Sequence, residues 1–93
     1  MTLAFEWDPL KAEANERKHG VSFAEAVTAF QDLRSLTIHD PDHSDREDRF
    51  ALLGMTAQGR LVVVIHVARR DRLRLVSARR ATRQEWLAYS GDR

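Results

Sequence analysis

Three strand-like segments follow one another so closely in the second half of the chain that short hairpins must join them. They span 49–56, 61–68 and 73–78, and the middle segment contains the apolar run Leu61–Ile65. Strands this close in sequence pair antiparallel, because a parallel pair needs a crossover of a dozen or more residues. The sequence therefore predicts an antiparallel meander at the centre of a sheet.

Capping signals predict helices on either side of the meander. Asp8 followed by Pro9 is typical of a helix start, and Gly20 of a left-handed helix end. Capping boxes at 22–25 and 82–85 predict a second helix and a short C-terminal helix. The second helix should bury one apolar stripe: Phe23, Ala26, Val27 and Phe30.

Two further strand candidates, at 3–7 and 33–39, complete the predicted order of elements. We expect an α+β fold, with an antiparallel sheet of about four strands, two N-terminal helices on one face of the sheet and a short C-terminal helix. A chain of 93 residues is long enough for one domain with its own core, so we expect residues 1–93 to form a single domain.

Composition and motifs exclude several classes of protein. The chain has no cysteine, which argues against disulfides and thiolate metal sites. Its N-terminus does not resemble a signal peptide, and its longest apolar run is far shorter than the roughly 20 residues of a membrane span. These features lead us to expect a cytoplasmic location. With four glycines the chain has no glycine-rich phosphate loop, so we expect no cofactor.

The acidic segment 40–48 raises the question of a metal site. It lacks the glycine and the closing glutamate of an EF-hand loop, and the four histidines show no paired ligand spacing. We expect this segment to be a solvated loop without a metal, although a metal-dependent nuclease remains a third hypothesis.

Positive charge is concentrated in the last third of the chain. Residues 60–93 contain nine arginines and three acidic residues, a net charge of +6, whereas residues 1–59 carry a net charge of −5. Guanidinium groups on a rigid strand suit a polyanion, because each can donate paired hydrogen bonds to a phosphate. The alternative is that these arginines only solvate the surface of a strand.

Metal-free cleavage of RNA is the chemistry that these residue types fit best. There the ribose 2′-hydroxyl attacks its own phosphorus, so the protein supplies groups that move protons and cations that stabilise phosphoryl charge. Suitable side chains are Lys18, His19, His43, Glu47, Arg49, His66, Arg74 and Arg79. His66 lies in an apolar strand and is equally suited to the core, and Lys18 and His19 would also stabilise the C-terminus of a helix. Arg74 and Arg79, five residues apart, face one phosphate only if the strand is irregular between them.

Several blocks of sequence resemble the BrnT family of ribonuclease toxins. They are Phe5-Glu-Trp7-Asp8-Pro, Lys18-His19-Gly20-Val-Ser22-Phe23, Glu47-x-Arg49, Gly54 and Arg74-x-x-Ser77-Ala78-Arg79-Arg80, in the family's order. The resemblance implies a RelE-like fold and a bacterial ribonuclease that inhibits translation. It also implies a partner antitoxin, a DNA-binding BrnA-like protein that forms a hetero-oligomer with the toxin.

The resemblance implies catalytic roles for six residues: Lys18, His19, Glu47, Arg49, Arg74 and Arg79. We further expect RNA contacts from four basic residues: Lys11, Arg72, Arg80 and Arg83. An antitoxin should cover at least part of the segment 74–83. The alternative function is a non-catalytic module whose basic edge binds nucleic acid or an acidic partner.

Overall fold

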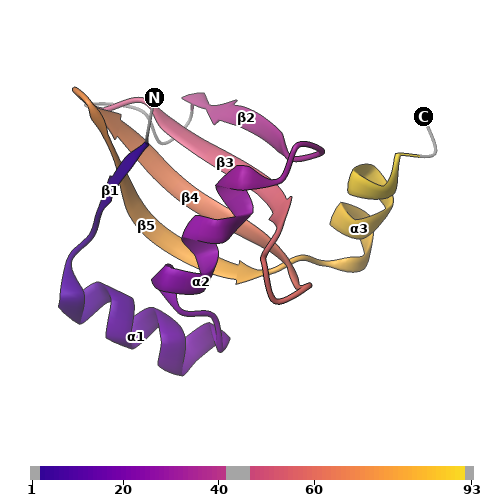
Figure 1. The fold of residues 1–93 in the computed structure, drawn as a ribbon, viewed down its shortest axis with the longest axis horizontal. Coiled ribbons are helices and arrows are strands. Elements are labelled where there is room, and N and C mark those ends of the chain that lie inside the picture. Colours follow the sequence, from indigo (N-terminus) through magenta and orange to yellow (C-terminus); the bar gives the residue numbers. More distant parts are fainter. Residues whose placement is uncertain (1–2, 42–46, 92–93) are drawn as a thin grey trace.

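The computed structural model describes residues 3–41 and 47–91, which form three α-helices and a five-stranded sheet (Figure 1). In chain order the elements are β1 (Ala4–Glu6), α1 (Pro9–His19), α2 (Phe23–Thr28), the 3-10 turn η1 (Ala29–Gln31), β2 (Leu36–Asp40), β3 (Arg49–Met55), β4 (Leu61–Arg69), β5 (Arg72–Arg80) and α3 (Arg83–Ser90). The predicted α+β class is confirmed. None of the helices in the described ranges is long and apolar enough to span a membrane.

The sheet differs from the prediction in strand number and direction. Its order is β1-β5-β4-β3-β2. Strands β3 to β5 form the predicted antiparallel meander, and β2 extends it as a further antiparallel strand. The predicted strand at 3–7 also forms, as β1, but it runs parallel to β5, with Phe5 opposite Leu73. The sheet is therefore five-stranded and mixed, because the first strand of the chain pairs with the last.

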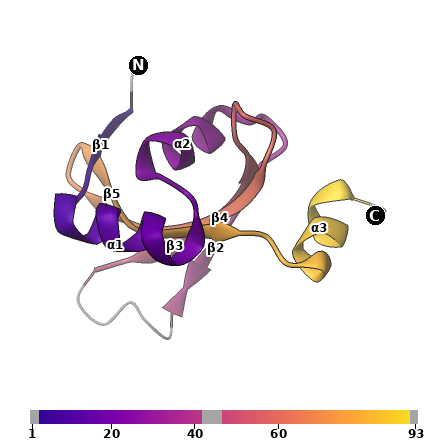
Figure 2. The same cartoon turned by 90° about the horizontal axis from the view of Figure 1, so that it is seen from below.

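Helix α2 packs on one face of the sheet, which we call the helix face, and α1 runs along the β5 edge on the same side (Figures 1 and 2). The opposite, open face carries no helix over most of its area. The core lies beneath the two helices, where Val62 and Val64 of β4 are fully buried. The other core residues are Val21, Phe23, Ala26, Ala29, Leu52, Leu75 and Ala78. Helix α3 stands beside the end of β5 and buries no residue.

The caps show which local predictions are met. Asp8 accepts a hydrogen bond from the Leu10 amide, and Thr82 and Glu85 form a complete capping box at α3. At α2 the predicted box is only half formed. Ser22 accepts from the Glu25 amide, but the Glu25 carboxylate turns inward to accept hydrogen bonds from Arg60 and Thr56 instead.

A buried asparagine completes the edge of β5 beyond the end of β1. Asn15 of α1 donates to the Ala78 carbonyl at 2.8 Å and accepts from the Ala78 amide at 3.0 Å. The side-chain amide of Asn15 thereby pairs with both the N–H and the C=O of Ala78, as a neighbouring strand would. These two hydrogen bonds fix α1 to the β5 edge of the sheet.

A bulge in β5 decides which of its arginines share a face. His66 of β4 pairs with Leu75 whereas the preceding Ile65 pairs with Ser77, so Val76 is an additional residue. An extra residue reverses the alternation of side chains beyond it. Arg74 and Arg79 therefore both face the open side of the sheet, opposite Val67 and Val63.

Candidate functional site

Four arginines from three strands gather at the end of the open face next to the β4–β5 hairpin. Arg49 of β3 and Arg74 of β5 both pair in register with Val67 of β4, and Arg69 pairs with Arg72 in the same way. Residues paired across neighbouring strands lie on one face, so all four side chains belong to a single surface. We call Arg49, Arg69, Arg72 and Arg74 the arginine cluster.

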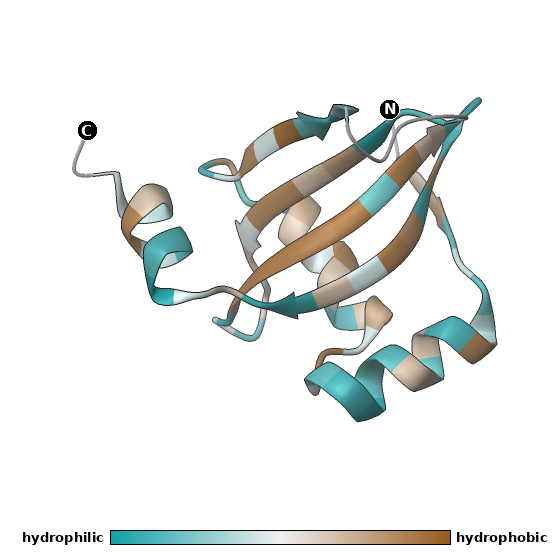
Figure 3. Ribbon diagram, turned by 180° about the vertical axis from the view of Figure 1, so that it is seen from behind, coloured by the Kyte–Doolittle hydropathy of each residue, from teal (hydrophilic) through white to brown (hydrophobic). Residues whose placement is uncertain are grey.

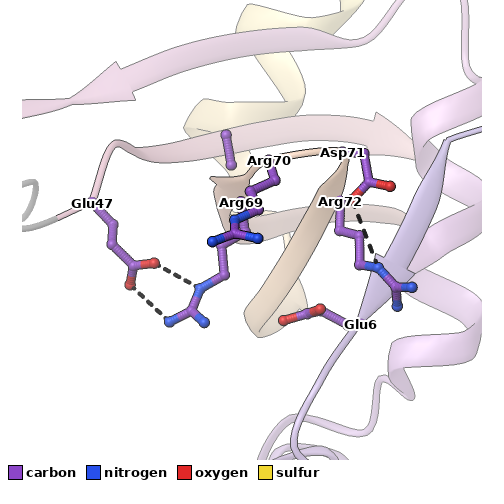
Figure 4. A pocket seen from close by; sticks show the side chains of 7 residues that line it. Glu6, Glu47, Arg69, Arg70, Asp71 and Arg72 are labelled. Atoms are coloured by element: carbon purple, nitrogen blue, oxygen red, sulfur yellow. Dashed lines mark hydrogen bonds and ion pairs between the residues drawn. The ribbon is translucent and has the colours of Figure 1, made fainter.

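Carboxylates surround the arginine cluster and offset its charge. Glu6 of β1 lies in register with Arg74 and accepts a hydrogen bond from its Nη1 at 3.1 Å. Glu47 binds Arg69 through both oxygens, with Oε2 at 2.7 Å from Nε and Oε1 at 3.3 Å from Nη2 (Figure 4). These hydrogen bonds and the charge of Glu47 raise the pKa of Arg69.

The cluster borders a solvent-open hollow of about 680 Å³ at the hairpin. Its lining is almost entirely charged, comprising Glu6, Glu47, Ala68, Arg69, Arg70, Asp71 and Arg72 (Figure 4). Figure 3, which looks onto the open face, shows hydrophilic residues at this hairpin and apolar residues along the middle of the central strands. The turn itself is unusual, because Arg70 adopts a positive φ of 53°.

The arginine side chains remain accessible to a ligand. The side chains of Arg69, Arg72 and Arg74 are 46%, 55% and 32% exposed. Like charges directly opposite each other on neighbouring strands destabilise a sheet, and the carboxylates relieve this repulsion in the free protein. A phosphate could take over the same guanidinium donors, because it accepts the same paired hydrogen bonds as a carboxylate.

The structure brings together some of the residues singled out from the sequence and separates others. Glu47, Arg49, Arg72 and Arg74 meet at the arginine cluster. Lys18 and His19 do not, because they end α1, which runs along the β5 edge of the sheet. Three more of those residues also lie away from the cluster: Lys11 on α1, Arg80 at the end of β5 and Arg83 at the start of α3. His43 lies outside the described residues.

Arg79 shares the open face but is engaged at the opposite end of the sheet. It donates from Nη1 and Nη2 to the two carboxylate oxygens of Glu85, both at 2.9 Å. Glu85 also accepts from the Thr82 amide at 2.7 Å, and the Arg79 hydrogen bond is the largest of the effects that lower its pKa to about 2. This contact joins the end of β5 to α3, about four residues along β4, or roughly 13 Å, from Arg74.

His66 lies in the core on the helix face and not in the arginine cluster. Its ring packs between Phe30 and Phe50, with centroids 4.9 and 5.8 Å away, and its Nδ1 lies 3.1 Å from the Val64 carbonyl. Burial lowers the pKa of His66, which favours the neutral ring. In the described ranges no group of three or more histidine, aspartate or glutamate side chains is arranged to hold a metal ion.

Sequence reasoning missed two members of the site, Glu6 and Arg69. Glu6 lies between Phe5 and Trp7, and its alternation with these aromatic residues marks it as facing away from the core. Its partner Arg74 is 68 residues away, however, so no local pattern reveals the ion pair. Arg69 lies one residue beyond the predicted strand segment 61–68, but β4 continues through it.

Comparisons with known proteins agree with this fold. The structure is similar to a crystal structure, at 1.1 Å resolution, of the Brucella abortus ribonuclease toxin BrnT. The TM-score is 0.64 at 22% sequence identity, and the match covers 88% of this chain and 100% of that one. No curated protein gives a significant match. The family model described as ribonuclease toxin, BrnT, of type II toxin-antitoxin system matches residues 7–85. The chain therefore belongs to the BrnT family of ribonuclease toxins of type II toxin–antitoxin systems.

Proposed function

We propose that this chain is a metal-independent endoribonuclease toxin that inhibits translation by cleaving RNA and is neutralised by a cognate protein antitoxin. The observation that carries the proposal is the pairing of Arg49 and Arg74 with the same residue, Val67, on the open face. Family membership supports the ribonuclease activity and the type II antitoxin partner. One toxin domain over residues 1–93 and a RelE-like fold remain predictions.

Arg49 and Arg74 are proposed to hold the scissile phosphate. Their strands flank β4, so their backbones are separated by two strand spacings, or roughly 10 Å. Long side chains from the two positions can approach one phosphate from opposite sides. Fixed guanidinium donors then stabilise the charge that develops on the phosphoryl oxygens. Arg72, in the next paired position, is proposed to bind a neighbouring phosphate.

The reaction needs no nucleophile from the protein. The ribose 2′-oxygen attacks phosphorus, the bond from phosphorus to the 5′-oxygen breaks, and the products are a 2′,3′-cyclic phosphate and a 5′-hydroxyl end. We assign to Glu47 the acceptance of the 2′-hydroxyl proton, because its carboxylate borders the hollow, and the departing 5′-oxygen takes a proton from water. Arg69 holds the Glu47 carboxylate in place through two contacts.

Lys18, His19 and Arg79 are assigned less central roles than the sequence suggested. Lys18 and His19 end α1 at the β5 edge of the sheet, and Arg79 is bound to Glu85, so each is expected to act outside the reacting phosphate. Their substitution should reduce cleavage less than substitution of Arg74. If substitution of one of these residues reduced cleavage as much as substitution of Arg74, that residue would belong to the catalytic group.

The test is cleavage of total RNA by the purified protein in EDTA. Arg74→Lys should lose about a hundredfold in rate, or roughly 3 kcal/mol of transition-state stabilisation, because lysine cannot bind two oxygens at once. Arg17→Lys is the matched control, since Arg17 is also paired with a carboxylate but lies on α1. Both variants should melt near the wild-type temperature.

Three outcomes would contradict the proposal. Cleavage that requires added Mg²⁺ would indicate a metal-dependent nuclease, and RNA binding without cleavage would indicate a non-catalytic module. An Arg74→Lys variant as active as the wild type would remove Arg74 from the site. Translation is tested separately: expression of the wild type alone should stop incorporation of labelled amino acids in bacteria, whereas the Arg74→Lys variant should be tolerated.

A further inference from the structure

A second basic surface lies at the other end of the sheet, where the β3–β4 turn, the end of β5 and the start of α3 meet. It encloses a hollow of about 300 Å³, a size within the usual range for small-molecule sites. The hollow is lined by Gly59, Arg60, Leu61, Arg80, Ala81 and Trp86. The RNA-cleaving site proposed above uses none of these residues.

Trp86 presents an accessible aromatic surface to this hollow. It is 44% exposed, and α3, which carries it, buries no residue. Its ring meets Tyr89 almost at a right angle, with centroids 6.3 Å apart. The other tryptophan, Trp7, packs against Phe23 and the core. An indole in this position can accept a flat ring against its face.

The two arginines of the hollow differ in how they are held. Arg60 is fixed, because it donates to both carboxylate oxygens of Glu25 and to the Gly20 carbonyl at 2.9 Å. Arg80 is exposed, and its guanidinium makes no hydrogen bond or ion pair with any residue in the described ranges. The pKa of Glu25 is lowered mainly by its hydrogen bond from Arg60, and the charge of Arg80 adds a smaller effect. The donors of Arg80 are therefore available to an anion.

We propose that this hollow is a nucleotide-binding subsite, in which a base of single-stranded RNA stacks on Trp86 and the adjoining phosphate binds Arg80. Proteins recognise single-stranded RNA largely by stacking its bases on aromatic side chains beside arginine. The subsite rests on the proposed ribonuclease function and lies roughly 17 Å along β5 from Arg74. Arg80 pairs with Val62 on the helix face whereas Arg74 faces the open side, so a single strand that binds both sites has to pass around the end of β5. Arg83 at the start of α3 adds positive charge near that end.

Binding is measured without cleavage by using a 2′-O-methyl hexanucleotide, which lacks the attacking hydroxyl. In a Trp7→Phe background Trp86 is the sole tryptophan, and the hexanucleotide should quench its fluorescence. Trp86→Ala should weaken binding of a fluorescein-labelled hexanucleotide about tenfold, and Trp86→Phe should restore most of it. Arg80→Ala should also weaken binding and reduce its salt dependence by about one phosphate contact. Leu87→Ala is the control, since Leu87 is 59% exposed and adjacent on α3.

Several results would overturn the subsite. Hexanucleotide binding that leaves Trp86 emission unchanged, or a Trp86→Ala variant that binds like the wild type, excludes base stacking. If inorganic polyphosphate quenches Trp86 fluorescence as strongly as the hexanucleotide does, the hollow binds anions without stacking a base. Quenching by a co-purified antitoxin but not by the hexanucleotide makes it a protein interface. If one of these results is found while Arg74→Lys still loses about a hundredfold in cleavage rate, the proposed subsite is wrong but the proposed function stands.

Discussion

The attachment of α3 depends on polar contacts, and Glu85→Gln should loosen it. The helix has no buried residue. Its side chains bind the rest of the domain through Glu85, which is held by Arg79 of β5, and through the Tyr89 hydroxyl, which donates at 2.7 Å to Asp32 after η1. Glutamine keeps the shape of the side chain but removes its charge. The substitution should therefore increase local detachment of α3 while the sheet stays folded.

The size of this effect follows from the pKa of Glu85. Its value of about 2 lies below the ordinary 4.5, and at 1.36 kcal/mol per pKa unit the difference corresponds to at most about 3.4 kcal/mol. However, the Arg79 side chain is 40% exposed and that of Glu85 is 28% exposed, so solvent screens the pair. Measured exposed pairs contribute up to about 1 kcal/mol, and we expect a loss of that size.

Amide hydrogen exchange measures the effect at each site. A loss of about 1 kcal/mol should lower the protection of amides 86–90 roughly fivefold, whereas Val62–Val64 of β4 should be unchanged. Because the folded pKa of Glu85 is depressed, its contribution is complete above about pH 4.5 and disappears as pH falls through about 2. The difference between variant and wild type should therefore shrink over that interval.

Glu13→Gln is the control for a general effect of losing an ion pair, since Glu13 and Arg17 form an exposed pair on α1. It should leave the protection of α3 unchanged. The reasoning is refuted if Glu85→Gln lowers the protection of β4 as much as that of α3, because α3 would then belong to the cooperative core. Unchanged protection of α3 would refute it equally.

Three further predictions concern stability, measured by thermal or denaturant unfolding. Arg60→Met should lower the free energy of unfolding by about 3 kcal/mol, or the melting temperature by roughly 15 °C, because it leaves the buried Glu25 carboxylate without its cation. Adding Glu25→Gln should recover part of this stability, and no recovery would contradict the explanation. Gly54→Ala should lower the free energy of unfolding by about 1–3 kcal/mol, because the new Cβ would lie 2.9 Å from the Ala29 carbonyl oxygen. Unchanged stability would mean that the backbone moves freely there. Arg70→Gly should raise the free energy of unfolding by up to about 1 kcal/mol, because glycine adopts the positive φ of 53° without strain. A loss of stability would show that the Arg70 side chain contributes more than the strain costs.

The sequence by itself determined the features that depend on neighbouring residues. The meander follows from short turns between apolar segments, and the ends of α1 from Asp8 and Gly20. The α3 capping box is likewise a contact between residues three apart, Thr82 and Glu85. Such contacts involve little chain entropy and leave periodic or capping signals that can be read directly. The family blocks, which are also local, identified the BrnT family.

Only the tertiary structure decided how distant segments come together. It paired β1 with β5, which brings Glu6 to Arg74, and it inserted Val76 as a bulge that places Arg74 and Arg79 on one face. It also fixed α1 along the β5 edge, which separates Lys18 from the arginine cluster. Strand register and helix docking depend on packing between residues tens of positions apart, and shifting a strand by one residue exchanges its two faces. The composition of a site built across four strands is therefore set by the fold, and local sequence patterns do not reveal it.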